Sequence, residues 1–386
     1  MQNTYYMDYQ ATSPCDPRVL EKMLPYFCEN FGNSHSSSHI VGKIAAEAIE
    51  DARSQIADLM GTSDPREIIF TSGATESCNL AIQGVARFYK EKGNRIITTN
   101  IEHKCTLEAF NSLGYEGFDP VFVPVKSNGI IDLEALKNAI NDKTTLVSII
   151  VANNEIGVIQ PIEEISKICR ERGVFLHLDA AQAFGKIKVD ASLADLISVS
   201  AHKIYGPKGI GALYIRLNPR VRLKPLTYGG GQERGIRPGT LPTPLCVGFG
   251  EACRIAKKEM EFEHSRLSEL SRRFIQKIQN NLPKAFLNGD PVHRIPGCIN
   301  MCFEGVEGES IMLGMPEVCV SSGSACASST LEPSHVLRAI SEREDIAHMS
   351  LRIGLGRFTT LQEVDYVALR IVEVVTHLRE MSPLWP

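Results

Sequence analysis

Short runs of β-branched and apolar residues alternate with stretches of helical periodicity through the first two thirds of the chain. Between residues 162 and 169, apolar residues recur at helical spacing after a proline, and a glycine follows at 173, which predicts a helix. This alternation indicates an α/β fold with a mostly parallel sheet buried between helices on both faces. The apolar runs predict strands at 67–71, 95–99, 145–152, 174–179, 196–200 and 211–215.

The pattern changes after about residue 255. Residues 259–282 have the spacing of a long amphipathic helix, 297–305 alternates like a strand, and 360–378 predicts a closing helix that begins with a capping-box pattern. A second, smaller α+β domain follows from this change. The expected division is a large domain at 16–255 and a small domain formed by 1–15 and 256–386.

Composition narrows the class of protein. The chain has 386 residues, 43% of them hydrophobic and 22% charged, with a formal net charge of −4. Because it has no basic run, we expect no direct nucleic-acid partner and no anionic lipid partner. It also has no apolar run long enough for a bilayer and no leader pattern at its N-terminus, so a cytoplasmic protein is expected. The 11 cysteines, without regular spacing, are interpreted as thiols in a reducing compartment.

Two predicted strands are followed by segments suited to a phosphate and to an acidic contact. TSGATES, 71–77, is a small-residue turn before a helix expected to begin near Thr75, and such a helix start presents free N–H groups to an anion. HLDAAQAFG, 177–185, places Asp179 at the carboxyl end of a strand, where open α/β sheets bind ligands. Taken alone, an ordinary turn and a helix N-cap explain these two segments equally simply.

Two further segments contribute cationic side chains. Lys203 leaves a buried strand in SVSAHKIYGPKGIG, and a Schiff base would neutralise its charge. A snorkelling surface lysine is the plain alternative. Arginines among glycines form a candidate carboxylate clamp, although each could instead hold a structural ion pair. These arginines are Arg234, Arg237, Arg352 and Arg357.

Together, a phosphate cup, a strand-end acid, a strand-end lysine and a carboxylate clamp suit pyridoxal phosphate and amino-acid chemistry. In its motifs the chain resembles the cysteine desulfurases, in particular the housekeeping iron–sulfur-cluster type. The resemblance extends over essentially the whole chain, and it implies a fold-type-I pyridoxal-phosphate enzyme with a seven-stranded type of sheet. The motifs that carry it are TSGATES, EHK, NNEIG, HLDAAQAFGK, AHKIYGPKGIGALY, GGGQERG, SSGSACAS, LEPSHVLRA and LGRFTT.

The resemblance implies a role for each matching residue. Lys203 would hold the cofactor and move the Cα proton, Asp179 would pair with the pyridinium nitrogen, and His103 would stack on the ring and take part in proton transfer. Gln182 would bond the phenolic oxygen. The implied phosphate ligands are Ala74, Thr75, Ser200, His202 and, from the neighbouring subunit of a homodimer, Thr240. Asn154 and Arg352 would bind the substrate carboxylate, and Asn154 would also lie close to the cofactor.

Cys326 lies in a small-residue segment, about 321–332, that is expected to be a mobile surface loop. By resemblance, its thiolate takes the sulfur of L-cysteine as a persulfide, leaving L-alanine. It then passes the sulfur to an iron–sulfur scaffold protein or another acceptor, with tRNA thiolation as a further use. No resident metal is expected, although Cys326 is a candidate transient ligand of a cluster shared with a scaffold. Cys105, two residues after His103, is a candidate oxidation-prone thiol beside the cofactor.

Three readings of the sequence remain. The first is a cysteine desulfurase. The second is selenocysteine lyase or an aminotransferase on the same fold, and Cys326 argues against a plain aminotransferase only. The third is a non-catalytic sulfur-relay or interaction module, against which the set Lys203, Asp179, His103 and Cys326 argues.

Overall fold

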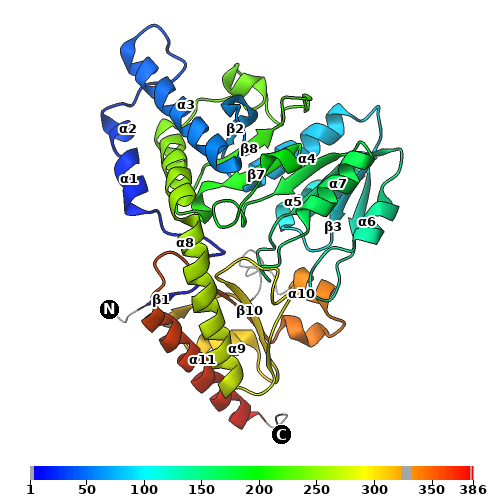
Figure 1. The fold of residues 1–386 in the computed structure, drawn as a ribbon, viewed down its shortest axis with the longest axis vertical. Coiled ribbons are helices and arrows are strands. Elements are labelled where there is room, and N and C mark those ends of the chain that lie inside the picture. Colours follow the sequence, from blue (N-terminus) through cyan, green and yellow to red (C-terminus); the bar gives the residue numbers. More distant parts are fainter. Residues whose placement is uncertain (1–3, 323–332, 383–384, 386) are drawn as a thin grey trace.

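The computed structural model describes residues 4–322, 333–382 and 385. A seven-stranded sheet forms its centre, in the order β2-β8-β7-β6-β5-β3-β4, and a three-stranded antiparallel sheet, β12-β10-β9, lies beyond it (Figure 1). The strands are β1 (Tyr5–Tyr6), β2 (Ile68–Thr71), β3 (Arg95–Thr99), β4 (Asp119–Val123), β5 (Thr144–Ile150), β6 (Phe175–Asp179), β7 (Leu196–Ser200), β8 (Gly211–Ile215), β9 (Ala285–Leu287), β10 (Cys298–Phe303), β11 (Val318–Cys319) and β12 (Ser350–Gly354).

Helices connect most of these strands and cover the central sheet. Among the described residues, none of them is both long and apolar enough to cross a membrane. The helices are α1 (Pro17–Met23), α2 (Pro25–Cys28), α3 (Ile40–Met60), α4 (Ala74–Phe88), α5 (Lys104–Tyr115), α6 (Leu133–Ala139), α7 (Ile162–Glu171), α8 (Thr243–Asn281), α9 (Gly308–Leu313), α10 (His335–Ile340) and α11 (Leu361–Met381).

The central sheet is buried on both faces, as the pattern of the strands predicted. Consecutive residues of one strand enter different hydrophobic clusters: Ile97 belongs to the cluster that includes residues of α3, α7 and α8, and Ile96 belongs to the one that includes residues of α4 and α5. β8 runs antiparallel to both neighbours, β2 and β7, and the remaining pairs are parallel. The mostly parallel sheet of the expected fold is therefore confirmed. Its parallel strands place their carboxyl ends, and the loops that follow, at one edge.

The six predicted strands correspond to observed strands within two residues at each end. The seventh, β4, was not predicted because its sequence, DPVFV, contains Pro120. β4 lies at the edge of the sheet and pairs only with β3. A proline is tolerated there because an edge strand leaves some of its N–H positions without a ladder partner.

The long helix was predicted too short. α8 begins at Thr243, well before residue 259, and runs without interruption through the expected domain boundary at 255. Its first half packs with α3 against the central sheet, while Leu267, Leu270 and Phe274 belong to a second hydrophobic cluster with β10, β12 and α11 (Figure 1). Two cores thus share one helix, and the division into two domains stays a prediction. The expected cysteine loop lies outside the described residues, apart from Ser321 and Ser322.

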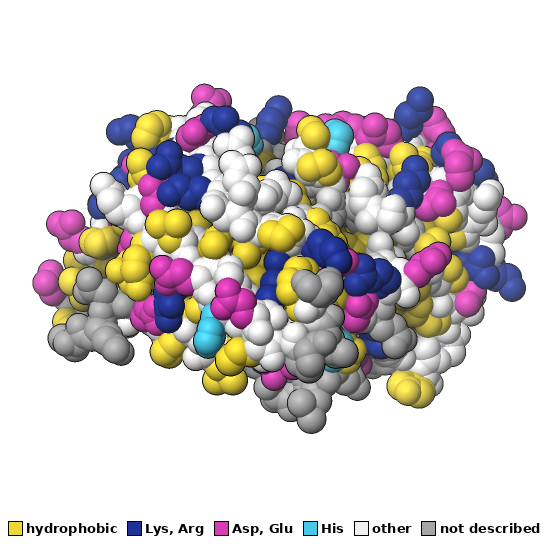
Figure 2. Space-filling view, turned by 90° about the horizontal axis from the view of Figure 1, so that it is seen from below, with side chains coloured by type: hydrophobic (Ala, Val, Ile, Leu, Met, Phe, Trp, Pro, Cys, Tyr) yellow, Lys and Arg dark blue, Asp and Glu magenta, His cyan; other side chains and the backbone are white. Residues whose placement is uncertain are grey.

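Charges of both signs cover the surface. Lys and Arg alternate with Asp and Glu over the face displayed in Figure 2, without a single-sign field. A strongly basic surface is the electrostatic footprint of nucleic-acid binding. The displayed face does not have that footprint, in line with the net charge of −4.

A buried histidine within the central sheet makes folding sensitive to acid. His177 on β6 lies between the hydroxyls of Ser148 and Ser198, each 2.8 Å from a ring nitrogen, and burial lowers the pKa of His177 to about 3. The unfolded chain, with a pKa near 6.5, binds this proton more readily, so stability is lost as the pH falls below that value. Between pH 7 and pH 5 we expect a loss of about 2 kcal/mol from this group. Urea unfolding at both pH values should show a smaller loss in His177→Gln; an equal loss in both proteins would contradict the assignment.

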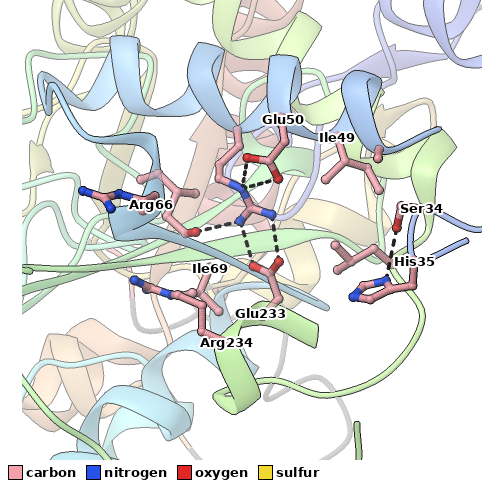
Figure 3. A pocket seen from close by; sticks show the side chains of 12 residues that line it. Ser34, His35, Ile49, Glu50, Arg66, Ile69, Glu233 and Arg234 are labelled. Atoms are coloured by element: carbon pink, nitrogen blue, oxygen red, sulfur yellow. Dashed lines mark hydrogen bonds and ion pairs between the residues drawn. The ribbon is translucent and has the colours of Figure 1, made fainter. Parts of the chain in front are cut away.

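A buried ion pair anchors the segment that follows β8. Arg53 of α3 donates from both terminal nitrogens to Glu233, at 2.8 Å each (Figure 3). The backbone N–H of Phe70 donates to the same carboxylate. Glu233→Gln leaves the Arg53 charge buried against a neutral amide, which we expect to cost about 3–5 kcal/mol in the free energy of unfolding. Glu50, which contacts Arg53 from an exposed position, supplies the control: Glu50→Gln should cost less than about 1 kcal/mol in the same urea titration. Equal costs would show that burial of this pair is not decisive.

Candidate active site

A cavity of about 510 Å³ opens at the carboxyl ends of the parallel strands. Loops that follow β2, β3, β5, β6 and β7 contribute to its wall, and β12 contributes one arginine. Ten of the residues singled out from the sequence line this one cavity. They are Ala74, Thr75, His103, Asn154, Asp179, Gln182, Ser200, His202, Lys203 and Arg352.

Two further residues of the predicted site, Thr240 and Cys326, stay predictions for different reasons. Thr240 is exposed and does not line the cavity, so its predicted role toward a neighbouring subunit stays a prediction. Cys326 lies outside the described residues. The described ends of its segment nevertheless reach the site. Ser321 accepts a hydrogen bond from Arg352 at 3.2 Å, and His335 lines the cavity.

The start of α4 forms the end of the cavity that suits an anion. The helix begins at Ala74, one residue before the predicted position, and no side chain caps it at Gly73. Gly73 has φ +153°, where a β-carbon would be strained although it would meet no atom within 4 Å. Gly73, Ala74 and Thr75 line the cavity, so the first turn of the helix and its positive dipole end lie at the cavity wall.

Asp179, the last residue of β6, is a buried carboxyl in the cavity wall. Its Oδ1 accepts from the backbone N–H of Ala181 at 3.0 Å. Burial is the largest cause that raises the pKa of Asp179, to about 6, and the nearby Cys105 raises it further. A cation bonded to this carboxylate would lower the pKa again.

Lys203 and Gln182 meet at the N-terminal segment of the chain. The Lys203 Nζ donates to the backbone carbonyls of Gln10 and Ala11, at 2.5 and 2.8 Å. The Gln182 amide donates to the same Gln10 carbonyl at 2.9 Å. These carbonyls orient the amine toward the cavity that Lys203 lines, while Asp179 lies on the neighbouring strand.

The two predicted histidines of the site, His103 and His202, are held by short contacts. His103 caps α5: its Nδ1 accepts from the backbone N–H of Cys105 at 3.2 Å and lies 3.1 Å from the Cys105 sulfur. An accepting Nδ1 places the proton of the neutral ring on Nε2. The Nδ1 of His202 contacts the Thr12 hydroxyl at 3.0 Å. Burial, with a smaller contribution from Lys203, lowers the pKa of His202 to about 4, so its ring is neutral at pH 7.

Arg352 is the arginine of the site. It is 2% exposed, pairs with Asp8 at 2.8 Å through Nη2 and donates to the Asn154 carbonyl through Nη1. Within the described part of the chain, its Nε and the side-chain oxygen of Asn154 are buried without a hydrogen-bond partner. Buried polar groups normally have partners, so these two atoms point to a ligand that supplies them.

The other three arginines of the expected clamp are not in the cavity, which corrects that part of the sequence prediction. Arg237 pairs with Glu76, Arg357 pairs with Asp16 and Glu263, and Arg234 lines a separate cavity beside the Arg53–Glu233 pair (Figure 3). Arg237 and Arg357 therefore hold structural ion pairs. Glycine neighbours occur around all four, so the local sequence did not distinguish them.

The sequence prediction missed several contributors. Gln10 acts through its backbone carbonyl, which leaves no side-chain signal. Glu155 follows Asn154 in NNEIG and lines the cavity, and Glu102 precedes His103 in EHK and is fully buried. Burial raises the pKa of Glu102 to about 8, and Glu155 accepts from Ser334 near the end of the undescribed segment.

Comparisons with known proteins agree with this site. The family model described as "Aminotransferase class-V" matches residues 5–367. The human protein "Cysteine desulfurase" is 57% identical over 382 residues, which cover 98% of this chain and 83% of the human one. "Cysteine desulfurase IscS" of Rickettsia africae is 58% identical over 382 residues, covering 98% and 93%.

Solved structures give the same picture. A "NIFS-LIKE PROTEIN" superposes with a TM-score of 0.90 at 36% identity, covering 97% of this chain and all of the other. "SspA in complex with cysteine" superposes with a TM-score of 0.82 at 39% identity, covering 92% of this chain and all of the other. The chain belongs to the class-V aminotransferase family of folds. Within that class, the chain belongs to the cysteine desulfurase family.

Enzymes of this family depend on pyridoxal phosphate, and the residues present fit that group. The uncapped start of α4 suits its phosphate, and the Asp179 carboxyl suits its ring nitrogen. The unpartnered oxygen of Asn154 supplies a further buried acceptor. A cavity of about 510 Å³ falls within the range of cofactor sites.

Proposed function

We propose that this chain converts L-cysteine to L-alanine and keeps the sulfur as a persulfide on Cys326. The observation that carries the proposal is one cavity lined by Lys203, Asp179 and Arg352, each from a different part of the chain. Relatives at 57–58% identity named cysteine desulfurases support it. A similar structure is titled as a complex with cysteine, which supports cysteine as the substrate here.

The residues that would hold the cofactor divide by the part of it that they suit. Asp179 would hold the ring nitrogen, Gln182 the phenolic oxygen and Lys203 the aldehyde carbon. Bound pyridoxal phosphate supplies an electron-withdrawing ring that stabilises negative charge at the Cα of an amino acid. The phosphate would be held by Ala74, Thr75, Ser200 and His202, with Thr240 of a second copy.

The chain's own groups provide binding and proton transfer. Arg352 and Asn154 would bind the substrate carboxylate through the buried atoms that lack partners. The Lys203 amine would take the Cα proton, and the carbonyls of Gln10 and Ala11 would position it for that step. His103, with its proton on Nε2, can donate at one face of the site.

Sulfur transfer needs a thiolate. The Cys326 sulfur would attack the sulfur of cysteine, so that an S–S bond forms and the Cβ–S bond of the substrate breaks. The electron pair of that bond returns to the carbon skeleton, which takes up a proton and leaves as alanine. The persulfide on Cys326 would then serve an iron–sulfur scaffold protein or another acceptor. A homodimer in the cytoplasm, with Thr240 shared between sites, is part of the same proposal.

Single-turnover labelling tests the function. The reduced holoenzyme is mixed with ³⁵S-labelled L-cysteine, and alanine, keto acid and protein-bound label are measured. We expect one alanine for each label bound, and the label should be released by a thiol. Keto acid without bound label would favour an aminotransferase. A chain that takes up no pyridoxal phosphate would favour the interaction module. Equal turnover of selenocysteine would favour the lyase.

A further inference from the structure

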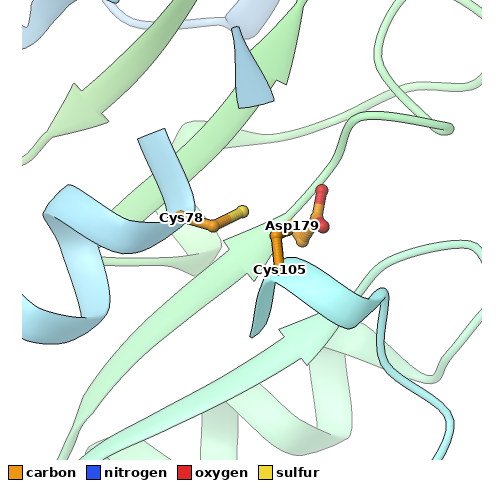
Figure 4. Close-up of side chains that lie close together, drawn as sticks. All are labelled: Cys78, Cys105 and Asp179. Carbon is orange, nitrogen blue, oxygen red and sulfur yellow. The ribbon is translucent and has the colours of Figure 1, made fainter. Parts of the chain in front are cut away.

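Two cysteines that the proposed function does not use lie beside the active site. Cys78 is in the second turn of α4, and Cys105 is in the first turn of α5, two helices that pack against each other. Their sulfur atoms and a carboxylate oxygen of Asp179 all lie within 4.8 Å of one another (Figure 4). We propose that Cys105 and Cys78 form an oxidisable thiol pair, in which a hydroperoxide oxidises Cys105 and Cys78 completes a disulfide.

Access from the cavity distinguishes the two thiols. Cys105 is partly exposed and lines the cavity, so a small oxidant that enters the site reaches it. Cys78 is fully buried behind it. The first attack therefore falls on Cys105, and Cys78 can react only with a group that Cys105 presents.

The hydrogen bonds and charges around the pair also favour ionisation of Cys105 over ionisation of Cys78. A hydrogen bond from Cys78 is the largest cause that lowers the pKa of Cys105, and the positive charge of a protonated His103, whose Nδ1 lies 3.1 Å from the sulfur, lowers it further. The same contact, together with burial and the Asp179 carboxylate, raises the pKa of Cys78. The Thr106 hydroxyl also favours the Cys105 thiolate, whereas burial opposes it. Cys105 is thus the thiolate and Cys78 the thiol.

One equivalent of hydroperoxide is sufficient to form the disulfide. The Cys105 thiolate attacks the peroxide, an S–O bond forms, the O–O bond breaks, and the leaving oxygen departs with a proton as water or alcohol. The Cys78 sulfur then attacks the sulfenic sulfur, an S–S bond forms, and the S–O bond breaks. The second oxygen leaves as water with the Cys78 proton. Two thiols are oxidised and one peroxide is reduced.

Hydrogen peroxide acting on the holoenzyme in a Cys326→Ser background tests this pair apart from the desulfurase reaction. Trypsin releases peptides 67–87 and 105–126, each with a single cysteine. After alkylation of free thiols, we expect these peptides to be joined, with the loss of two hydrogens. Folded protein without this joined peptide, after other thiols have reacted, would overturn the proposal.

Two variants separate the roles. In Cys78→Ala we expect Cys105 to stop at the sulfenic acid, which dimedone traps, and to react more slowly because the hydrogen bond is lost. Cys169→Ala removes an equally buried cysteine elsewhere, on α7, and should leave the joined peptide unchanged. Dimedone labelling on Cys78 in the parent, or none on Cys105 in Cys78→Ala, would overturn the assignment.

The pH dependence of the oxidation rate distinguishes a Cys105 thiolate from a cysteine that only packs. The rate at which the free Cys105 peptide is lost should change by less than about threefold between pH 8 and pH 6, since the Cys105 thiolate persists. An ordinary thiol, with a pKa near 8.5, would slow by roughly 75-fold over this interval. A fall of that size for Cys105 would contradict the proposal.

Discussion

Replacing Lys203 by alanine is expected to lower the rate of alanine formation by at least about 10³-fold. The variant loses both the amine that would hold the cofactor and the base that would take the Cα proton, and a positioned base alone contributes about 10²–10⁴ in rate. The fold should remain, because Lys203 is only partly buried and its recorded hydrogen bonds include two to backbone carbonyls of the N-terminal segment.

Borohydride reduction provides the second measurement. In the parent it should fix pyridoxal phosphate to the peptide that contains Lys203, and in Lys203→Ala it should fix none. Lys188→Ala, which removes a lysine with an 84% exposed side chain outside the cavity, is the control and should retain the parent's rate. A Lys203→Ala variant within tenfold of the parent would show that another group removes the proton.

The parts of the fold that follow from local pattern were predicted well. Strands buried on both faces have continuous apolar runs, so β3, β7 and β8 appear at the predicted residues. The edge strand β4 was missed because Pro120 is allowed only by its place in the sheet. The full length of α8 was missed because its two halves pack against different cores, and its periodicity therefore has no single stripe.

Prediction of the site from the sequence was limited in the same way, to what local motifs contain. Residues within recognisable motifs, such as Asp179 and Lys203, line one cavity, and their roles stay predictions. Contacts between distant segments were not visible in the sequence. Arg352 pairs with Asp8 and also lines the cavity, whereas Arg357 pairs with Asp16 and Glu263 outside it. Cys78 has no motif of its own, and only the packing of α4 on α5 brings it to Cys105.

Cys326→Ser is expected to abolish persulfide formation while leaving cofactor binding intact. A serine hydroxyl has the shape of the thiol, but its pKa is too high and it cannot form the S–S bond. In the single-turnover experiment we expect no thiol-labile ³⁵S on the chain and alanine formation reduced by at least about 10³-fold. The absorbance of bound cofactor should be the same in parent and variant, because Cys326 is not among the proposed cofactor ligands.

The described residues before this segment lie at the cavity. Ser321 is bonded to Asp8 and Arg352, and a chain of four residues can span up to about 14 Å. Action of Cys326 on a substrate whose carboxylate Arg352 holds stays part of the proposal. The matched control is Cys319→Ser, a thiol on β11 just before this segment, which should label as the parent does. Label that persists in Cys326→Ser but disappears in Cys319→Ser would move the acceptor role to Cys319, and the path of the sulfur would have to be redrawn.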